Sequence, residues 1–167
     1  MNSDKKLTVI ELKKEAMNFS AGHFTIFSAT ERENMHGHNY QVSIFLSTFL
    51  DTQTGLSFDY RFYKKYILTL CKKLDETFLM PGKSLYLTWK EENGYIWFTF
   101  NNQKIPFLPS DVTIIPVSNI TVEELSGWFI QEMLKNTAQL KKDRIHKIIV
   151  KVFSGQGQSG SSCWEDV

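Results

Sequence analysis

The sequence predicts an α+β fold built around an antiparallel sheet, and three observations carry this prediction. Apolar and polar side chains alternate through a long segment at 38–50, which is typical of a strand with one buried face. Two segments, at 58–74 and 121–135, repeat apolar side chains at helical spacing. The other β-rich segments fall in pairs around these helices. Paired strands separated by helices are typical of the α+β class.

The N-terminal half is predicted to contain strands followed by the first helix. Residues 7–12 and 17–27 are rich in β-forming side chains, and the long strand at 38–50 follows them. A turn is expected at 52–55, where the sequence reads Thr-Gln-Thr-Gly. In the helix at 58–74, apolar residues recur every four positions while lysines occupy other faces.

The C-terminal half is predicted to hold a hairpin, the second helix and a final strand. Residues 85–100 form the hairpin, because an Asn-Gly pair separates two β-rich runs. Thr121 and Glu124 make a capping-box pattern where the second helix begins. A β-rich run at 146–153 follows, and then a turn rich in glycine and serine.

Length and composition indicate one domain over 1–167, since 167 residues can bury a sizeable core. The net charge of +1 gives no basic footprint for nucleic acid. No apolar run reaches the roughly twenty residues of a membrane span, and no leader is visible, so we expect a soluble, cytoplasmic protein without a membrane partner. Cys71 and Cys163 are predicted to be reduced and unpaired.

Three of the four histidines form a cluster, His23 with His36-Gly37-His38. His36 and His38 are two residues apart, so on a strand both rings leave the same face. His23 then has to arrive from a neighbouring segment. Neutral imidazole binds zinc, and three protein ligands with one open position are typical of catalytic zinc. The sequence therefore predicts a Zn²⁺ site held by His23, His36 and His38, with His146 outside it.

Five motifs, in this order, resemble the 6-pyruvoyl-tetrahydropterin synthase family, which also holds the 6-carboxytetrahydropterin synthases. The matching segments lie at 19–23, 36–40, 57–60, 74–79 and 121–125. The resemblance implies a T-fold, which is a four-stranded antiparallel sheet with two helices on one face. It also implies subunits that join through their sheets into a barrel, as a homo-oligomer that is either a trimer or a hexamer. Compared with short members, residues at about 83–105 are expected to form an inserted hairpin.

The resemblance also implies an activity, that of a lyase of folate or queuosine biosynthesis. The substrate would be a small-molecule pterin, 7,8-dihydroneopterin triphosphate. Zinc held by the three histidines would bind the oxygens of the substrate side chain and increase their acidity.

The chain departs from the family pattern at the catalytic base. Usual members carry a cysteine shortly before His-Gly-His, and residues 28–35 of this chain contain none. Glu33 instead makes the arrangement Glu-x-x-His-Gly-His, which resembles a subgroup that converts the triphosphate to 6-hydroxymethyl-7,8-dihydropterin. A carboxylate beside zinc can accept a proton, and cleavage of a side-chain carbon–carbon bond can follow. Glu31, two residues earlier, is the alternative base.

Two other departures affect the remaining site residues. The family's Asp-His pair is Asp75-Glu76 here, so we expect Asp75 to assist catalysis and Glu76 to replace the histidine. A pterin-binding glutamate usually follows the last long strand, and this chain has Ser154 there. The residues expected to bind substrate are Thr121, Glu123 and Ser154, with Glu165 or a backbone carbonyl as the alternative to Ser154.

Two other functions remain open from the sequence. One is a 6-pyruvoyl- or 6-carboxytetrahydropterin synthase, against which the missing cysteine and histidine argue. The other is a T-fold protein that binds a pterin or purine without catalysis, which the simultaneous loss of several family residues suggests.

Overall fold

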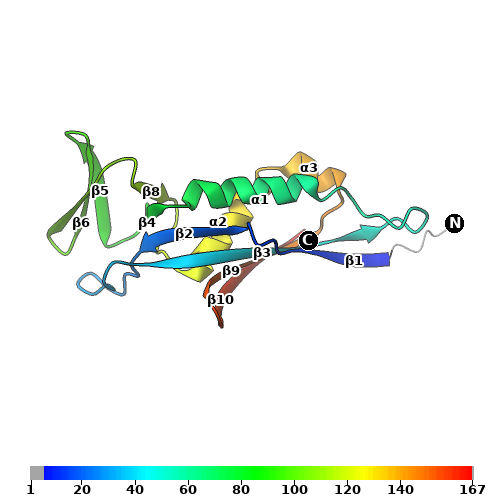
Figure 1. The fold of residues 1–167 in the computed structure, drawn as a ribbon, viewed down its shortest axis with the longest axis horizontal. Coiled ribbons are helices and arrows are strands. Elements are labelled where there is room, and N and C mark those ends of the chain that lie inside the picture. The colour runs from blue at the N-terminus through cyan, green and yellow to red at the C-terminus, as the bar shows by residue number, and fades with distance from the viewer. Residues whose placement is uncertain (1–5, 167) are drawn as a thin grey trace.

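The computed structural model describes residues 6–166, which form ten strands and three helices (Figure 1). The strands are β1 (Lys6–Leu12), β2 (Asn18–His23), β3 (His36–Leu50), β4 (Thr77–Pro81), β5 (Leu87–Glu92), β6 (Tyr95–Phe100), β7 (Gln103–Phe107), β8 (Val112–Ile115), β9 (Lys147–Gly155) and β10 (Gln158–Glu165). The helices are α1 (Arg61–Leu74), α2 (Val122–Leu134) and α3 (Thr137–Lys142). None of these helices, within the described residues, is long and apolar enough to cross a bilayer.

Seven strands form the main sheet. Six of them lie in the order β10-β9-β3-β2-β4-β8, and the seventh, β1, pairs with β3. The predicted α+β class is confirmed, and the sheet is larger than the four antiparallel strands expected. Its β2–β4 and β4–β8 pairings are parallel, so the sheet is mixed. These extra strands have only five and four residues, too few for a periodic pattern to reveal them.

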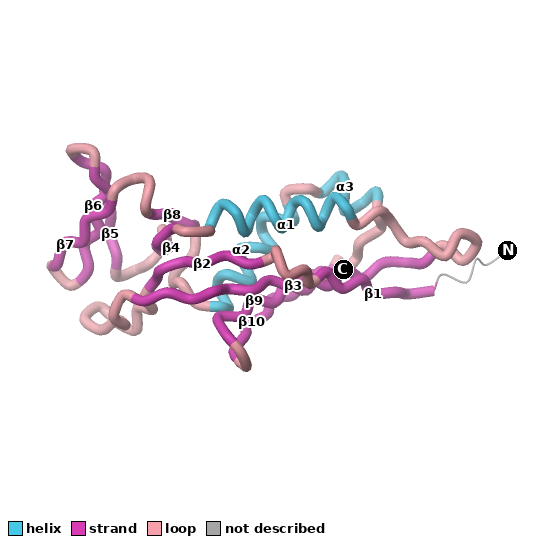
Figure 2. Tube along the Cα trace, viewed as in Figure 1, coloured by secondary structure: helices cyan, strands magenta, loops and turns pink. Residues whose placement is uncertain are grey.

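The long strand β3 organises this sheet, because its two halves pair with different partners. Its first half pairs with β2, and its second half pairs with β1. The side chains of Val42, Ile44 and Leu46 are fully buried. They lie in one core with residues of α1 and α2, including Ile67 and Phe129, and Figure 2 shows α1 running along the sheet. On the other face of β3, Gln41, Phe45 and Phe49 are half-buried while Ser43 and Ser47 are buried, so the alternation in the sequence separates a fully buried apolar face from a face of mixed burial.

The predicted hairpin at 85–100 is part of a separate three-stranded sheet, β5-β6-β7, at one end of the molecule (Figure 1). Asn93 and Gly94 both have positive φ, as the predicted turn requires. Asn101 and Asn102 make a second turn with positive φ, which adds β7 and which the sequence analysis missed. The serine- and glycine-rich C-terminal segment was expected to be a turn, and it is mostly the strand β10, paired along β9.

A second, smaller core joins the three-stranded sheet to the rest of the chain. Phe98 and Phe100 of β6 lie in this core with Met80 of β4. The same core holds Phe24 and Ile26, which directly follow β2. The three-stranded sheet is therefore packed against the loop at 24–35, which connects β2 to β3.

The start of α2 confirms part of the predicted capping box. The side-chain oxygen of Thr121 accepts a hydrogen bond from the Glu124 amide at 3.3 Å, as an N-cap does. The Glu124 carboxylate accepts its hydrogen bond from the Ser118 hydroxyl at 2.6 Å. The Glu124 side chain therefore binds the segment before the helix and not the Thr121 amide, which it would bind in a complete capping box.

Candidate metal centre and active site

Three imidazole rings converge at the end of the β2–β3 pair. His23 ends β2 and lies opposite His36, which begins β3. The Nε2 atoms of His36 and His38 are 3.1 Å apart, so both rings leave the same face of the strand, as predicted. One ring nitrogen from each of the three histidines lies within 4.8 Å of the others. Among the described residues, this is the one group of three or more such side chains that could hold a metal ion.

The backbone orients the rings by hydrogen-bonding to their remaining nitrogens. The Nδ1 atom of His23 lies 3.1 Å from the Ile120 carbonyl, and that of His36 lies 2.8 Å from the Asn34 carbonyl. A carbonyl only accepts, so each neutral ring carries its proton on Nδ1 and leaves a lone pair on Nε2. The ring of His38 is hydrogen-bonded to the backbone of Ser154. Such support is typical of metal-ligating histidines.

Two observations indicate that the three histidines are suited to bind a divalent cation. The Nε2 atom of His23 is buried and has no hydrogen-bond partner within the described part of the chain. Burial, reinforced by the charges of His36 and His38, lowers the pKa of His23 to about 4. Burial also lowers the pKa of His38, followed by the charge of His36. The neutral form is the one that binds metal, and three nitrogen donors suit zinc.

Glu33 lies in the same cavity as the histidines, while its predicted alternative does not. The Glu33 Oε2 atom accepts a hydrogen bond from the Thr25 amide at 2.9 Å, and the Glu33 amide donates to the Thr25 carbonyl at 2.9 Å. Burial raises the pKa of Glu33, but the hydrogen bonds of Thr25 and the charges of His36 and His23 outweigh it and lower that pKa. Glu33 is therefore ionised at neutral pH and able to accept a proton. Glu31 is exposed in the turn at 27–31.

The cavity has a volume of about 440 Å³ and brings distant segments together. Thr121 and Glu123, at the start of α2, line it, as does Ser154 near the end of β9. All three predicted substrate-binding residues therefore lie beside the histidines. Among the residues that the structure describes, none of those lining this cavity in one copy is a lysine or arginine.

Asp75 and Glu76 lie outside this cavity in one copy of the chain. The Asp75 carboxylate accepts a hydrogen bond from the Ser20 amide at 2.8 Å, beyond the C-terminus of α1. The Glu76 amide donates to the Ser20 carbonyl at 2.8 Å, and its φ of 56° is unusual for a residue with a side chain. Glu76 lines an open groove with His38 and Phe78. A single copy therefore does not bring this pair together with Glu33.

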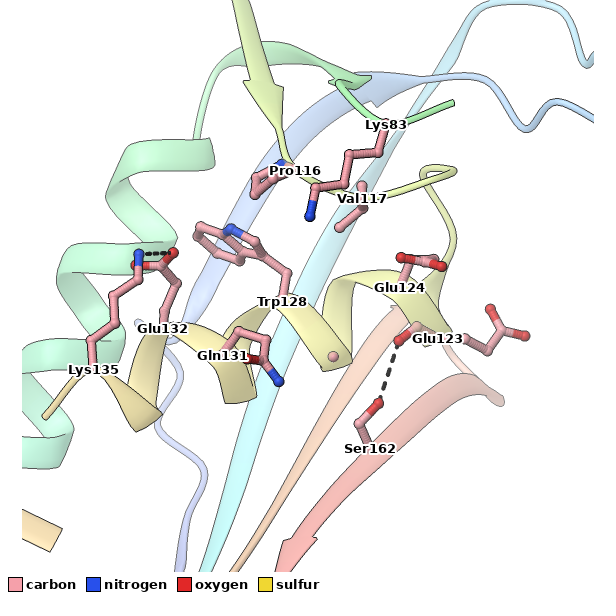
Figure 3. Close-up of a pocket in the computed structure, with 11 residues that line it drawn as sticks. Lys83, Pro116, Val117, Glu123, Glu124, Trp128, Gln131, Glu132, Lys135 and Ser162 are labelled. Atoms are coloured by element: carbon pink, nitrogen blue, oxygen red, sulfur yellow. Dashed lines mark hydrogen bonds and ion pairs between the residues drawn. The ribbon is translucent and has the colours of Figure 1, made fainter. Parts of the chain in front are cut away.

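A second, larger cavity of about 570 Å³ runs along α2 from Glu123 to Lys135 (Figure 3). Trp128, Pro116 and Lys83 line it, and Glu123 borders both cavities. No histidine is among its lining residues. The three clustered histidines and Glu33 lie in the smaller cavity.

Gly160 of β10 allows a close approach to α2. A Cβ atom at this position would lie 2.8 Å from the Glu123 backbone nitrogen and from the Val122 carbonyl carbon. We expect Gly160→Ala to push the first turn of α2 outward and lower the free energy of unfolding by about 1–3 kcal/mol in urea titrations. Gly155→Ala is the control, because a Cβ there meets nothing within 4 Å. Equal stability of the two variants would contradict this account.

Comparison with known proteins identifies relatives along nearly the whole chain. The sequence model of the 6-pyruvoyl tetrahydropterin synthase family matches residues 11–159. Two curated relatives carry the name "Putative 6-carboxy-5,6,7,8-tetrahydropterin synthase". The Methanocaldococcus jannaschii protein is 24% identical over 142 residues, which cover 85% of this chain and 86% of the relative. The Pyrococcus horikoshii protein is 27% identical over 137 residues, which cover 81% and 78%.

Solved structures confirm the predicted T-fold. The 6-pyruvoyl tetrahydropterin synthase of Plasmodium falciparum superposes with a TM-score of 0.88 at 23% identity, covering 95% of this chain and 98% of the other. The Plasmodium vivax protein of the same name gives a TM-score of 0.88 at 24% identity, covering 96% and 99%. Two further P. vivax structures are described as catalytic-residue mutants, in which a glutamate is replaced by alanine or by cysteine.

Proposed function

Because this chain belongs to the 6-pyruvoyl tetrahydropterin synthase family, we propose that it is a zinc-dependent lyase that converts 7,8-dihydroneopterin triphosphate to 6-hydroxymethyl-7,8-dihydropterin. The observation that carries this proposal is the position of Glu33. Its carboxylate shares a cavity with His23, His36 and His38, in a chain without a cysteine at 28–35. The similar P. vivax enzyme also has a glutamate described as a catalytic residue, which supports the same role here.

The residues of the chain divide the work of this reaction. His23, His36 and His38 would hold zinc, which when bound polarises the oxygens of the substrate side chain. Glu33 accepts a proton from a side-chain hydroxyl, and the carbon–carbon bond beside that hydroxyl then breaks. The phosphorylated two-carbon fragment leaves as an aldehyde, and the electron pair of the broken bond stays with the pterin-bearing fragment, whose side-chain carbon takes up a proton. The Thr25 amide aims the carboxylate into the cavity. Thr121 and Glu123 contact the pterin, together with the backbone or side chain of Ser154.

The proposed assistance by Asp75 and Glu76 requires a second copy of the chain, since one copy keeps them outside the cavity. The outer face of the main sheet supports assembly into a homo-oligomer. Leu7 and Val9 of β1 are 57% and 55% exposed, and they lie opposite Phe49 and Ser47 of β3. An apolar strand face of this kind gains stability when another sheet covers it.

The direct test is incubation of the zinc-loaded protein with 7,8-dihydroneopterin triphosphate, followed by chromatographic identification of the pterin product. We expect 6-hydroxymethyl-7,8-dihydropterin. The alternative product is a 6-carboxy- or 6-pyruvoyl-tetrahydropterin, and the names of the archaeal relatives favour the former. Absence of turnover, with zinc stoichiometric and the assembly intact, would contradict any enzymatic function on this substrate and leave ligand binding alone.

A further inference from the structure

Arg32 links the loop that carries Glu33 to the three-stranded sheet. Its guanidinium carbon lies 4.6 Å from the ring centre of Phe24 and 5.8 Å from that of Phe100. Both rings are buried, and Phe100 is the last residue of β6. The Arg32 Nη1 atom also donates a hydrogen bond to the Glu33 carbonyl at 2.7 Å. One side chain therefore contacts the second core and the backbone of the proposed catalytic base.

The two arms of the loop at 24–35 are held in different ways. On the first arm, Asn119 binds Ile26 twice, because its Oδ1 accepts from the Ile26 amide at 3.0 Å and its Nδ2 donates to the Ile26 carbonyl at 2.8 Å. The second arm carries Glu33, whose backbone and carboxylate both bind Thr25 on the first arm. Arg32 is the side chain that fastens this second arm to the second core.

We propose that Arg32 is a positioning residue, which sets the placement of Glu33 by joining its backbone to Phe24 and Phe100. Through this contact the three-stranded sheet acts on the active site, although none of its residues lines the cavity. The inference rests on the proposed function, in which Glu33 accepts the proton. Arginine suits this role better than lysine, since its planar guanidinium stacks on aromatic rings and donates in its own plane at the same time.

The expected effect of Arg32→Met falls on the rate of the chemical step. Without the contacts of Arg32, the Glu33 carboxylate can shift, and a misplacement of about 1 Å can reduce kcat by roughly 10- to 100-fold. Arg32 does not line the cavity, so KM should change by less than about threefold and the zinc content should not change. Arg32→Lys keeps the charge but loses the planar guanidinium group. We expect its kcat to lie between those of the wild type and Arg32→Met.

A double-mutant cycle separates positioning from general damage to the fold. If Arg32 acts through Glu33, adding Arg32→Met to Glu33→Gln should change the residual kcat by less than about twofold. Multiplication of the two effects would overturn the proposal, because Arg32 would then act by another route. Arg61→Met is the matched control: Arg61 is 85% exposed at the start of α1, where it pairs with Asp59.

Hydrogen exchange provides a readout that needs no substrate. In Arg32→Met, peptides covering 24–35 should exchange faster, whereas those covering α1 should match the wild type. Unchanged exchange together with unchanged kcat would refute the positioning role and leave the proposed function standing. If the wild type has no turnover, the proposed function fails, and unchanged exchange in 24–35 would still refute the inference.

Discussion

Glu33→Gln is expected to reduce kcat by about 10²- to 10⁴-fold, the range that a general base contributes. Glutamine has nearly the same shape, and its side-chain oxygen can still accept the hydrogen bond from the Thr25 amide. It cannot take up the proton at neutral pH. Zinc content and substrate affinity should be preserved, because the three histidines and α2 are untouched. Steady-state kinetics give kcat and KM, and metal analysis of the same sample gives the zinc content.

Glu31→Gln is the matched control for this experiment. Glu31 is exposed and lies outside the cavity, so its amide variant should keep the wild-type kcat. If Glu31→Gln loses turnover and Glu33→Gln retains it, the assignment of the base is reversed. If the wild type binds substrate without turning it over, the protein is a binding module rather than an enzyme.

His38→Ala is expected to weaken zinc binding by more than about 100-fold, since even loss of an outer-shell partner costs 10- to 100-fold. The variant keeps only His23 and His36 of the converging nitrogens. Zinc should raise the melting temperature of the wild type and should not raise that of the variant at the same concentration. Turnover should disappear together with the metal.

His146→Ala is the control for zinc binding. His146 stacks on Phe49 at a centroid distance of 5.0 Å and is not part of the histidine cluster. This variant should retain one zinc per chain and the zinc-dependent rise in melting temperature. Stoichiometric zinc in His38→Ala after dialysis against a chelator would show that the three-histidine site is not the metal site.

The parts of the fold that the sequence predicted are those with a strong local signal. The alternation in β3 and the helical spacing in α1 and α2 each extend over thirteen or more residues. The Asn-Gly turn in the three-stranded sheet is set by two residues that tolerate positive φ. In contrast, β4 and β8 are stabilised by backbone pairing with distant strands, and their short sequences carry little sign of it. β10 pairs with the neighbouring strand β9, and its serine-rich sequence has low β-propensity.

The same division holds at the site. Two histidines at i and i+2 on a strand must point the same way, so the sequence predicted that His36 and His38 would act together. Two of the three rings are supported from segments far away in the chain, His23 by Ile120 and His38 by Ser154, whereas His36 is supported locally by Asn34. Carbonyl groups occur at every residue, so nothing in the sequence marks the ones that orient a ring. Arg32 was missed for a similar reason, since its aromatic partner Phe100 lies 68 positions further along the chain.

The sequence by itself determined which chemistry the chain can host, because imidazole and carboxylate groups at fixed short spacing keep their relation in any extended segment. Tertiary structure decided which of these groups meet. It placed Glu33, rather than Glu31, beside the rings, and it kept Asp75 and Glu76 on another surface of the single copy. The physical reason is that strand register and the packing of two separate cores are properties of the whole chain, and local spacing does not encode them.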